Sequence, residues 1–247
     1  MCASACCGLF YLDGPPVIDV ALPALVVGTL LTCLAGLPIW TFCALCLGFF
    51  AARATEELLV PPLVRGALPP FLVGVVFLVL LRTDFRRVWG KPVGREARWL
   101  TPLIVVCSAV GLWLWFKYHP APRFVQALRR QPAWLLWAAL VPVSLANGIG
   151  EELIFRGALL SALSRSLQVW LAVVLQAVAF GLWHWNGGLP YGLVGAGMAA
   201  ALGLALGVLR VFSGSLWPCM LVHGCGGIVM GTFLIRANTC WYCHHLW

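Results

Sequence analysis

The sequence predicts an all-α polytopic integral membrane protein, because the chain is apolar throughout and its apolar stretches are long. Of its 247 residues, 62% are hydrophobic and only 10% are charged, against about 25% charged residues in an ordinary soluble domain. The mean hydropathy is +0.95. A soluble fold could not bury this much apolar surface, and the stretches lack the alternation that is typical of a transmembrane barrel.

The apolar stretches are consistent with about eight transmembrane helices of about 15–25 residues each. The first two can also be one bent helix, because only Gly-Leu-Pro at 36–38 offers a turn between them. The segments lie near residues 17–36, 38–52, 66–81, 99–116, 133–162, 167–185, 189–210 and 215–235.

The net charge of +8 is typical of basic loops in a membrane protein and gives little support to nucleic-acid binding. Loop 82–98 carries six basic and two acidic residues and is predicted to be cytoplasmic. Loop 117–132 should face the other side, yet it carries four basic residues, so loop charge leaves the orientation open. We expect the protein in the plasma membrane of a prokaryote.

The chain ends on a cysteine- and histidine-rich tail, CWYCHH, from Cys240 to His245. Two Cys and two adjacent His could hold zinc, but the Cys-x-x-Cys pair has no second half at normal finger spacing. Disulfide bonds between these cysteines, or lipid attachment to their thiols, are equally consistent with this tail.

Ionisable residues are rare in the apolar second half of the chain. After residue 96 the only acids are Glu151 and Glu152, and the only histidines inside apolar runs are His184 and His223. Any one of these residues could have a structural role. A glutamate could pair with an arginine and hold two helices together, and a buried histidine could simply form a hydrogen bond to a carbonyl. Polar groups in lipid usually face the bundle interior and mark function, so the four together indicate a site.

Helical spacing organises these side chains. Glu152 and Arg156 are four residues apart and can pair, while Glu151 points about 100° away. Asn147 precedes Glu151 by four residues and shares its face if the helix continues through the intervening glycines. The next helix carries a stripe at four-residue steps: Gln176, Phe180 and His184. With His223 on the last helix, three polar faces are predicted to converge.

Three motifs resemble those of the CPBP intramembrane proteases (CAAX prenyl endopeptidase and bacteriocin-processing family). EELIFRG at 151–157 resembles their EExxxR motif, and FGLWH at 180–184 resembles their FxxxH motif. GVLRVFSGSLWPCMLVHG at 207–224 resembles the approach to their third motif. The resemblance covers about residues 130–236 and implies a conical catalytic cavity between the later helices.

The resemblance implies a division of the chain into three parts. The N-terminal transmembrane helices at 1–125 match no recognised family. A CPBP-like catalytic core occupies 126–238, and the short Cys/His tail occupies 239–247.

The resemblance also implies an activity, that of a glutamic-type intramembrane endopeptidase without a cofactor. Glu151 would be the general base that activates water, assisted by His184. Glu152 would pair with Arg156 and hold the helix, and His223 would stabilise the oxyanion. The expected partners are the lipid bilayer and a membrane-anchored or lipidated protein or peptide substrate.

The chain departs from the family at Gly227, where the third motif has Asn or Asp four residues after its His. Asn147, Gln176 or Asn186 could supply the missing donor. We expect Gly227 to leave a space that an asparagine would fill. A degenerate member with weak or no hydrolysis is also consistent with this glycine.

Other functions stay open. Zinc held by Glu151, His184 and His223 would make a CAAX-type metalloprotease, because two His and one Glu form a known catalytic set. A non-catalytic family member could act in bacteriocin immunity or as a membrane scaffold. A transporter could use the cluster as a proton relay, but the inverted repeats expected of one are not found in the sequence.

Overall fold

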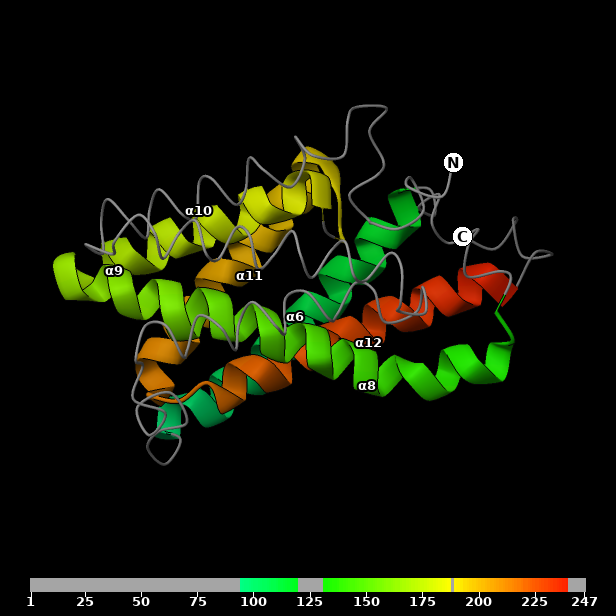
Figure 1. The fold of residues 1–247 in the computed structure, drawn as a ribbon, viewed down its shortest axis with the longest axis horizontal. Helices are drawn as coiled ribbons and strands as arrows, with labels where there is room; N and C mark the ends of the chain where they lie inside the picture. Colours follow the sequence, from blue (N-terminus) through cyan, green and yellow to red (C-terminus); the bar gives the residue numbers. More distant parts are fainter. Residues whose placement is uncertain (1–93, 120–130, 188, 240–247) are drawn as a thin grey trace, which may run out of the picture.

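The computed structural model describes residues 94–119, 131–187 and 189–239, and every regular element in these ranges is a helix (Figure 1). This agrees with the predicted all-α fold. The elements are α6 (Arg95–Tyr118), α8 (Ala133–Glu152), the π-helix η2 (Leu153–Leu159), α9 (Leu160–Ser166), α10 (Val169–Gly187), α11 (Gly192–Ser213) and α12 (Trp217–Thr239).

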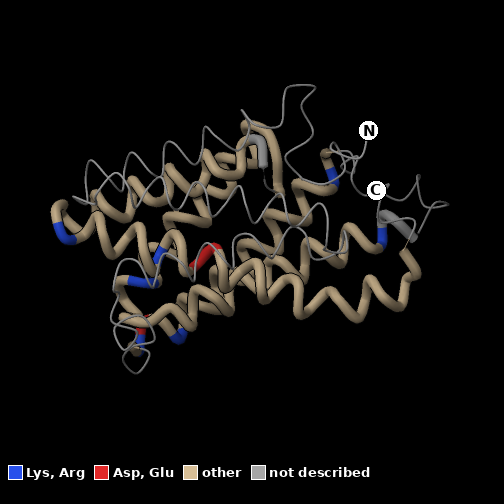
Figure 2. Tube along the Cα trace, viewed as in Figure 1, with Lys and Arg blue, Asp and Glu red and all other residues tan. Residues whose placement is uncertain are grey.

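Four helical stretches in the described ranges are long and apolar enough to cross a membrane, so the protein is an integral membrane protein. The apolar helix Val169–Trp185 is shorter. Lys and Arg lie mostly toward the ends of the helices, and acidic residues are few (Figure 2). The four long stretches are Arg95–Tyr118, Ala133–Ser166, Gly192–Ser213 and Trp217–Arg236.

The five later predicted segments each coincide with a helix, whereas those at 17–36, 38–52 and 66–81 lie outside the described residues. The total of eight therefore stays a prediction. The segment predicted at 133–162 is longer than expected, because α8, η2 and α9 continue to Ser166 as one helical stretch of 34 residues. It passes through Gly148 and Gly150 without a break.

Small residues bring α8 and α12 together as an antiparallel pair (Figure 1). A Cβ added to Gly148 would lie 3.1 Å from the backbone nitrogen of Gly224. One at Gly227 would lie 3.0 Å from the Cβ of Ser144. Small residues let helix backbones approach closely inside a membrane, where packing replaces the hydrophobic effect as the force between helices.

The same principle joins α10 and α11, which follow one another in the chain. A Cβ on Gly203 would lie 3.1 Å from the Cα of Ala177, and one on Gly181 would lie 2.8 Å from the Cβ of Ala200. Larger side chains at these positions would separate the helices. The hairpin therefore holds its two backbones close together near the middle of α10.

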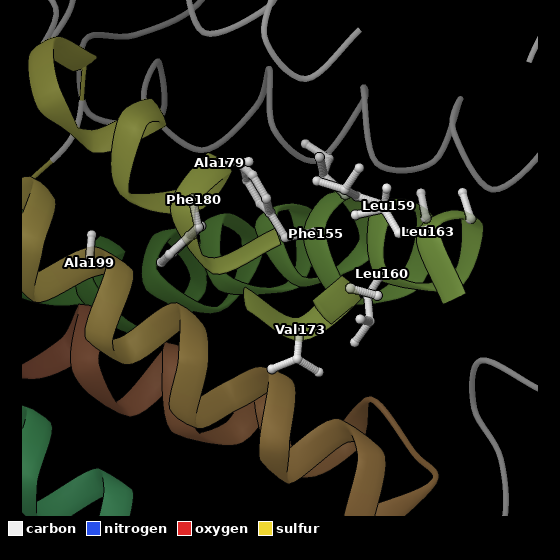
Figure 3. Close-up of a cluster of buried hydrophobic side chains, with 12 residues drawn as sticks. Phe155, Leu159, Leu160, Leu163, Val173, Ala179, Phe180 and Ala199 are labelled. Carbon is white, nitrogen blue, oxygen red and sulfur yellow. The ribbon is translucent and has the colours of Figure 1, made fainter. Parts of the chain in front are cut away.

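Bulkier side chains fill the space that α10, η2 and α9 enclose with α11 (Figure 3). Phe155 packs edge-on against Phe180 with ring centroids 4.9 Å apart, and Leu159, Leu163 and Val173 are buried around them. On the outside of the bundle, large side chains such as Trp134, Trp170 and Leu193 are exposed, as expected for helices that contact lipid.

The contact between α8 and α12 gives a stability prediction. Gly148→Ala should lower the melting temperature in detergent, because the new methyl group would meet the backbone of α12, which cannot rotate away. Overpacking of this kind costs about 1–3 kcal/mol. Gly226→Ala on α12 is the matched control, since its added Cβ meets no described atom within 4 Å. Equal melting temperatures for the two variants would contradict the close packing.

Candidate active site

Five ionisable side chains singled out from the sequence meet inside the helix bundle. The end of α8 supplies the two glutamates, η2 the arginine, α10 one histidine and α12 the other. Each of the five exposes less than a tenth of its surface. They are Glu151, Glu152, Arg156, His184 and His223. The predicted convergence of three polar helix faces is therefore present.

Glu152 is the anchor of this cluster. Its Oε1 accepts a hydrogen bond of 2.8 Å from Arg156 Nη1, which is the pair that the four-residue spacing predicted. The same oxygen lies 2.8 Å from Nδ1 of His223. Helical spacing could not reveal this second contact, because the two residues are 71 positions apart. Glu152, at the end of α8, thus links η2 to α12 through its contacts with Arg156 and His223.

Glu151 has one bound and one unbound carboxylate oxygen. Its Oε1 accepts a hydrogen bond of 3.3 Å from Asn147 Nδ2. Its Oε2 is buried and has no hydrogen-bond partner among the described residues. That oxygen lies 3.5 Å from Nε2 of His223 and 3.9 Å from Nε2 of His184. A base with this arrangement can receive a proton from a small molecule held between the imidazoles.

The other nitrogen of each imidazole defines which tautomer this arrangement favours. Nδ1 of His184 lies 2.9 Å from the carbonyl oxygen of Phe180. Because a carbonyl only accepts, this Nδ1 carries the hydrogen, and in the neutral ring Nε2 is an acceptor. Nδ1 of His223 likewise donates to the Glu152 carboxylate. Both Nε2 atoms are therefore left for the chemistry beside Glu151.

Charge balance distinguishes the two histidines. The two carboxylates and the Arg156 guanidinium sum to a formal charge of −1, so one imidazolium would make the buried cluster neutral. A buried charge is tolerated only when it is paired. His223 is the better placed of the two rings, because it contacts both Glu151 and Glu152.

Arg156 is held by α11 as well as by Glu152. Its Nη2 lies 3.3 Å from the carbonyl oxygen of Gly203, and its guanidinium carbon lies 4.5 Å from the ring centroid of Phe180. The same Phe180 ring contacts His184 at 4.5 Å and His223 at 5.8 Å between centroids. Phe180 is therefore the apolar wall shared by the arginine and both imidazoles.

Gln176 does not take the place expected of an oxyanion donor. Its Nε2 donates to the carbonyl oxygens of Gly203, at 2.8 Å, and Val173, at 3.0 Å. The side chain is fully buried. The amide is used to join α10 to α11, because a mid-helix carbonyl can accept an additional bond from a neighbouring helix. The side chain of Asn186 lies outside the described residues.

The expectation of empty space beside Gly227 is wrong. An added Cβ there would lie 3.0 Å from the Cβ and 3.3 Å from the Oγ of Ser144. The glycine is needed for the approach of α8 to α12, so an asparagine at 227 would have to push the helices apart. Sequence spacing along α12 could not reveal this, because the obstacle belongs to α8.

Metal ligation was the alternative interpretation of the same side chains. Within the described ranges, no group of three or more His, Cys, Asp or Glu side chains is arranged to hold a metal ion. The second proposed zinc site, from Cys240 to His245, lies outside those ranges.

A buried glutamate–histidine cluster in a bundle of apolar helices is consistent with a catalytic site inside a membrane. Residues 132–229 match the family described as type II CAAX prenyl endopeptidase Rce1-like. This part of the chain, which contains all five clustered side chains, is a domain of that family, and the resemblance inferred from the three motifs is confirmed. No curated protein and no solved structure matches the chain significantly.

The Glu152–Arg156 pair gives a prediction about stability. Arg156→Ala should lower the melting temperature in detergent more than Glu151→Gln does, because it leaves a buried carboxylate without its cation. Loss of one partner of a buried pair costs about 3–5 kcal/mol. Arg165→Ala, at an exposed arginine of α9, is the control and should have little effect. If Glu151→Gln proves the more damaging, the pair is not the structural anchor of the site.

Proposed function

We propose that the protein is a glutamic-type intramembrane endopeptidase that hydrolyses a peptide bond with water activated by Glu151 and His184. One observation carries the proposal. The buried Oε2 of Glu151 has no hydrogen-bond partner among the described residues and faces the Nε2 atoms of His184 and His223. The match of residues 132–229 to a family of prenyl endopeptidases supports the same reaction class.

Hydrolysis follows from the two acceptors beside the proposed water. A water that donates one hydrogen to Glu151 Oε2 and one to His184 Nε2 directs an oxygen lone pair outward. As that oxygen attacks the carbonyl carbon of the scissile bond, its proton passes to Glu151. The carbonyl oxygen becomes an oxyanion. Glu151 then delivers the proton to the amine nitrogen as the C–N bond breaks, which releases a carboxylic acid and an amine.

His223 is the proposed donor to the oxyanion. Its Nδ1 is fixed against Glu152, so Nε2 of the imidazolium can donate toward the substrate without reorganising. A preorganised donor that contacts the oxyanion is worth about 3 kcal/mol in the transition state. Arg156 acts indirectly. It donates to the Glu152 oxygen that orients the His223 ring.

The proposed substrate is a membrane-anchored or lipidated protein or peptide, cleaved near the membrane surface. His184 is three residues before Gly187, the last residue of α10. At a rise of 1.5 Å per residue the imidazole is about one turn from that helix end. We further propose that residues 1–125 add transmembrane helices to a catalytic core at 126–238 that encloses a conical cavity, and that the membrane is the plasma membrane of a prokaryote.

A non-catalytic role, as an immunity protein or scaffold, is the second candidate. It is favoured by Gly227, where helix packing against Ser144 occupies the position of the family's polar residue. A protein of this kind would retain the Glu152–Arg156–His223 contacts for stability while lacking turnover.

The proposal predicts that Glu151→Gln abolishes cleavage while the protein stays folded in the membrane, because the amide cannot accept the proton of water. Membranes that contain the wild type or the variant are compared by mass spectrometry of protein C-termini. A farnesylated peptide that ends in a CAAX sequence serves as a defined probe. New C-termini should require the wild-type glutamate.

Glu96→Gln, at an exposed glutamate of α6, is the matched control and should cleave like the wild type. Identical C-termini in wild-type and Glu151→Gln membranes would overturn the protease assignment. That result would favour the non-catalytic candidate.

The mechanism also predicts that activity does not depend on a metal ion, since the proposed reaction already uses Glu151, His184 and His223 as base, acceptor and donor. Treatment of the active, purified protein with a chelator should leave its cleavage rate unchanged. One zinc ion per chain, whose removal abolishes cleavage and whose return restores it, would replace this mechanism by that of a metalloprotease.

A further inference from the structure

We infer that Asn147 is a positioning residue that fixes the carboxylate of Glu151, and this inference rests on the proposed function. Its Nδ2 donates to Glu151 Oε1 at 3.3 Å, one helical turn along α8. The bond holds one carboxylate oxygen on the α8 side. The other oxygen, Oε2, is thereby presented to the two imidazoles.

Oε1 of Glu151 needs such a partner because no cation among the described residues contacts it, whereas Oε2 lies 3.5 Å from Nε2 of His223. The neighbouring guanidinium of Arg156 is bound to Glu152 and to the carbonyl of Gly203. A carboxylate in an apolar bundle that lacks a donor can rotate about its last bond, and its basic oxygen would then be poorly aimed. One neutral hydrogen bond restricts that rotation without cancelling the charge that makes Glu151 a base.

Two other donors near the site already have acceptors. The Gln176 amide donates to Val173 and Gly203, and Nδ1 of His184 faces the Phe180 carbonyl. In the described part of the chain, the side-chain hydrogen bond to Oε1 of Glu151 is the one from Asn147.

The α8 backbone at Asn147 is held firmly enough to position the Glu151 carboxylate. The next residue, Gly148, packs against the backbone of His223 and Gly224. The turn of α8 that carries the amide is therefore fixed relative to the helix that carries His223. Positioning by a rigid neighbour is effective in catalysis, where a misplacement of about 1 Å can cost roughly 10²-fold in rate.

The test replaces Asn147 by leucine, which has a similar shape and no donor. With the substrate whose new C-terminus depends on Glu151, Asn147→Leu should lower kcat by roughly 10²-fold and leave KM and the melting temperature nearly unchanged. Asn147→Gln, which keeps the carboxamide, should recover much of the lost kcat. Thr232→Val is the matched control. It removes a half-buried hydroxyl that bonds to the Ile228 carbonyl on α12, and kcat should not change.

A second measurement does not need a substrate. Loss of the donated hydrogen bond should shift the infrared carboxylate band of Glu151, assigned with Glu151→Gln, in Asn147→Leu and not in Thr232→Val. An unshifted band, or wild-type kcat in Asn147→Leu, overturns the positioning role and leaves the protease assignment intact. If no cleavage depends on Glu151, the proposed function fails, and the band alone decides whether Asn147 holds the carboxylate.

Discussion

The need to neutralise charge inside an apolar bundle is the constraint on which the rest of the structure depends. Glu152 lies fully buried and is stabilised by Arg156 on one side and His223 on the other, each at 2.8 Å from the same oxygen. These two contacts join the long α8–α9 stretch to α12. Because an unpaired charge is costly in lipid, helix packing and charge pairing have to be satisfied together. A helix shift that breaks either contact leaves a buried ion without its partner.

Glycine and alanine make this pairing possible. Arg156 contacts the Gly203 carbonyl at the place where α11 packs against α10 through small residues. His223 reaches Glu152 because α12 lies against the Gly148 face of α8. The π-helix η2, all of whose residues are buried, begins directly after Glu152, and such segments often lie at functional sites. The polar site therefore requires the close helix contacts, and a bulky residue at one of them would separate the charges as well as the backbones.

The sequence predicted the parts of the site that depend on a single helix. The Glu152–Arg156 pair and the shared face of Asn147 and Glu151 follow from four-residue spacing, and both contacts are present. The parts that depend on two helices were not predictable in this way. The bond from His223 to Glu152 and the use of the Gln176 amide on Gly203 require knowledge of which helices are neighbours. The predicted space at Gly227 was wrong for the same reason, since Ser144 of α8 occupies it. The all-helical fold was predictable from composition, while the number of helices before residue 94 was not tested.

The antiparallel arrangement of α8 and α12 also changes how the glycine at 227 is interpreted. Side chains lean toward the N-terminus of their own helix. Gly148 lies opposite Gly224, and Ser144 lies opposite Gly227. A side chain at 147 therefore leans toward the level of Gly227, and one at 227 would lean toward the level of Gly148. Because an added Cβ at Gly227 would lie 3.0 Å from the Cβ of Ser144, a carboxamide at 227 would require α8 and α12 to move apart, whereas the carboxamide of Asn147 already contacts Glu151 from α8.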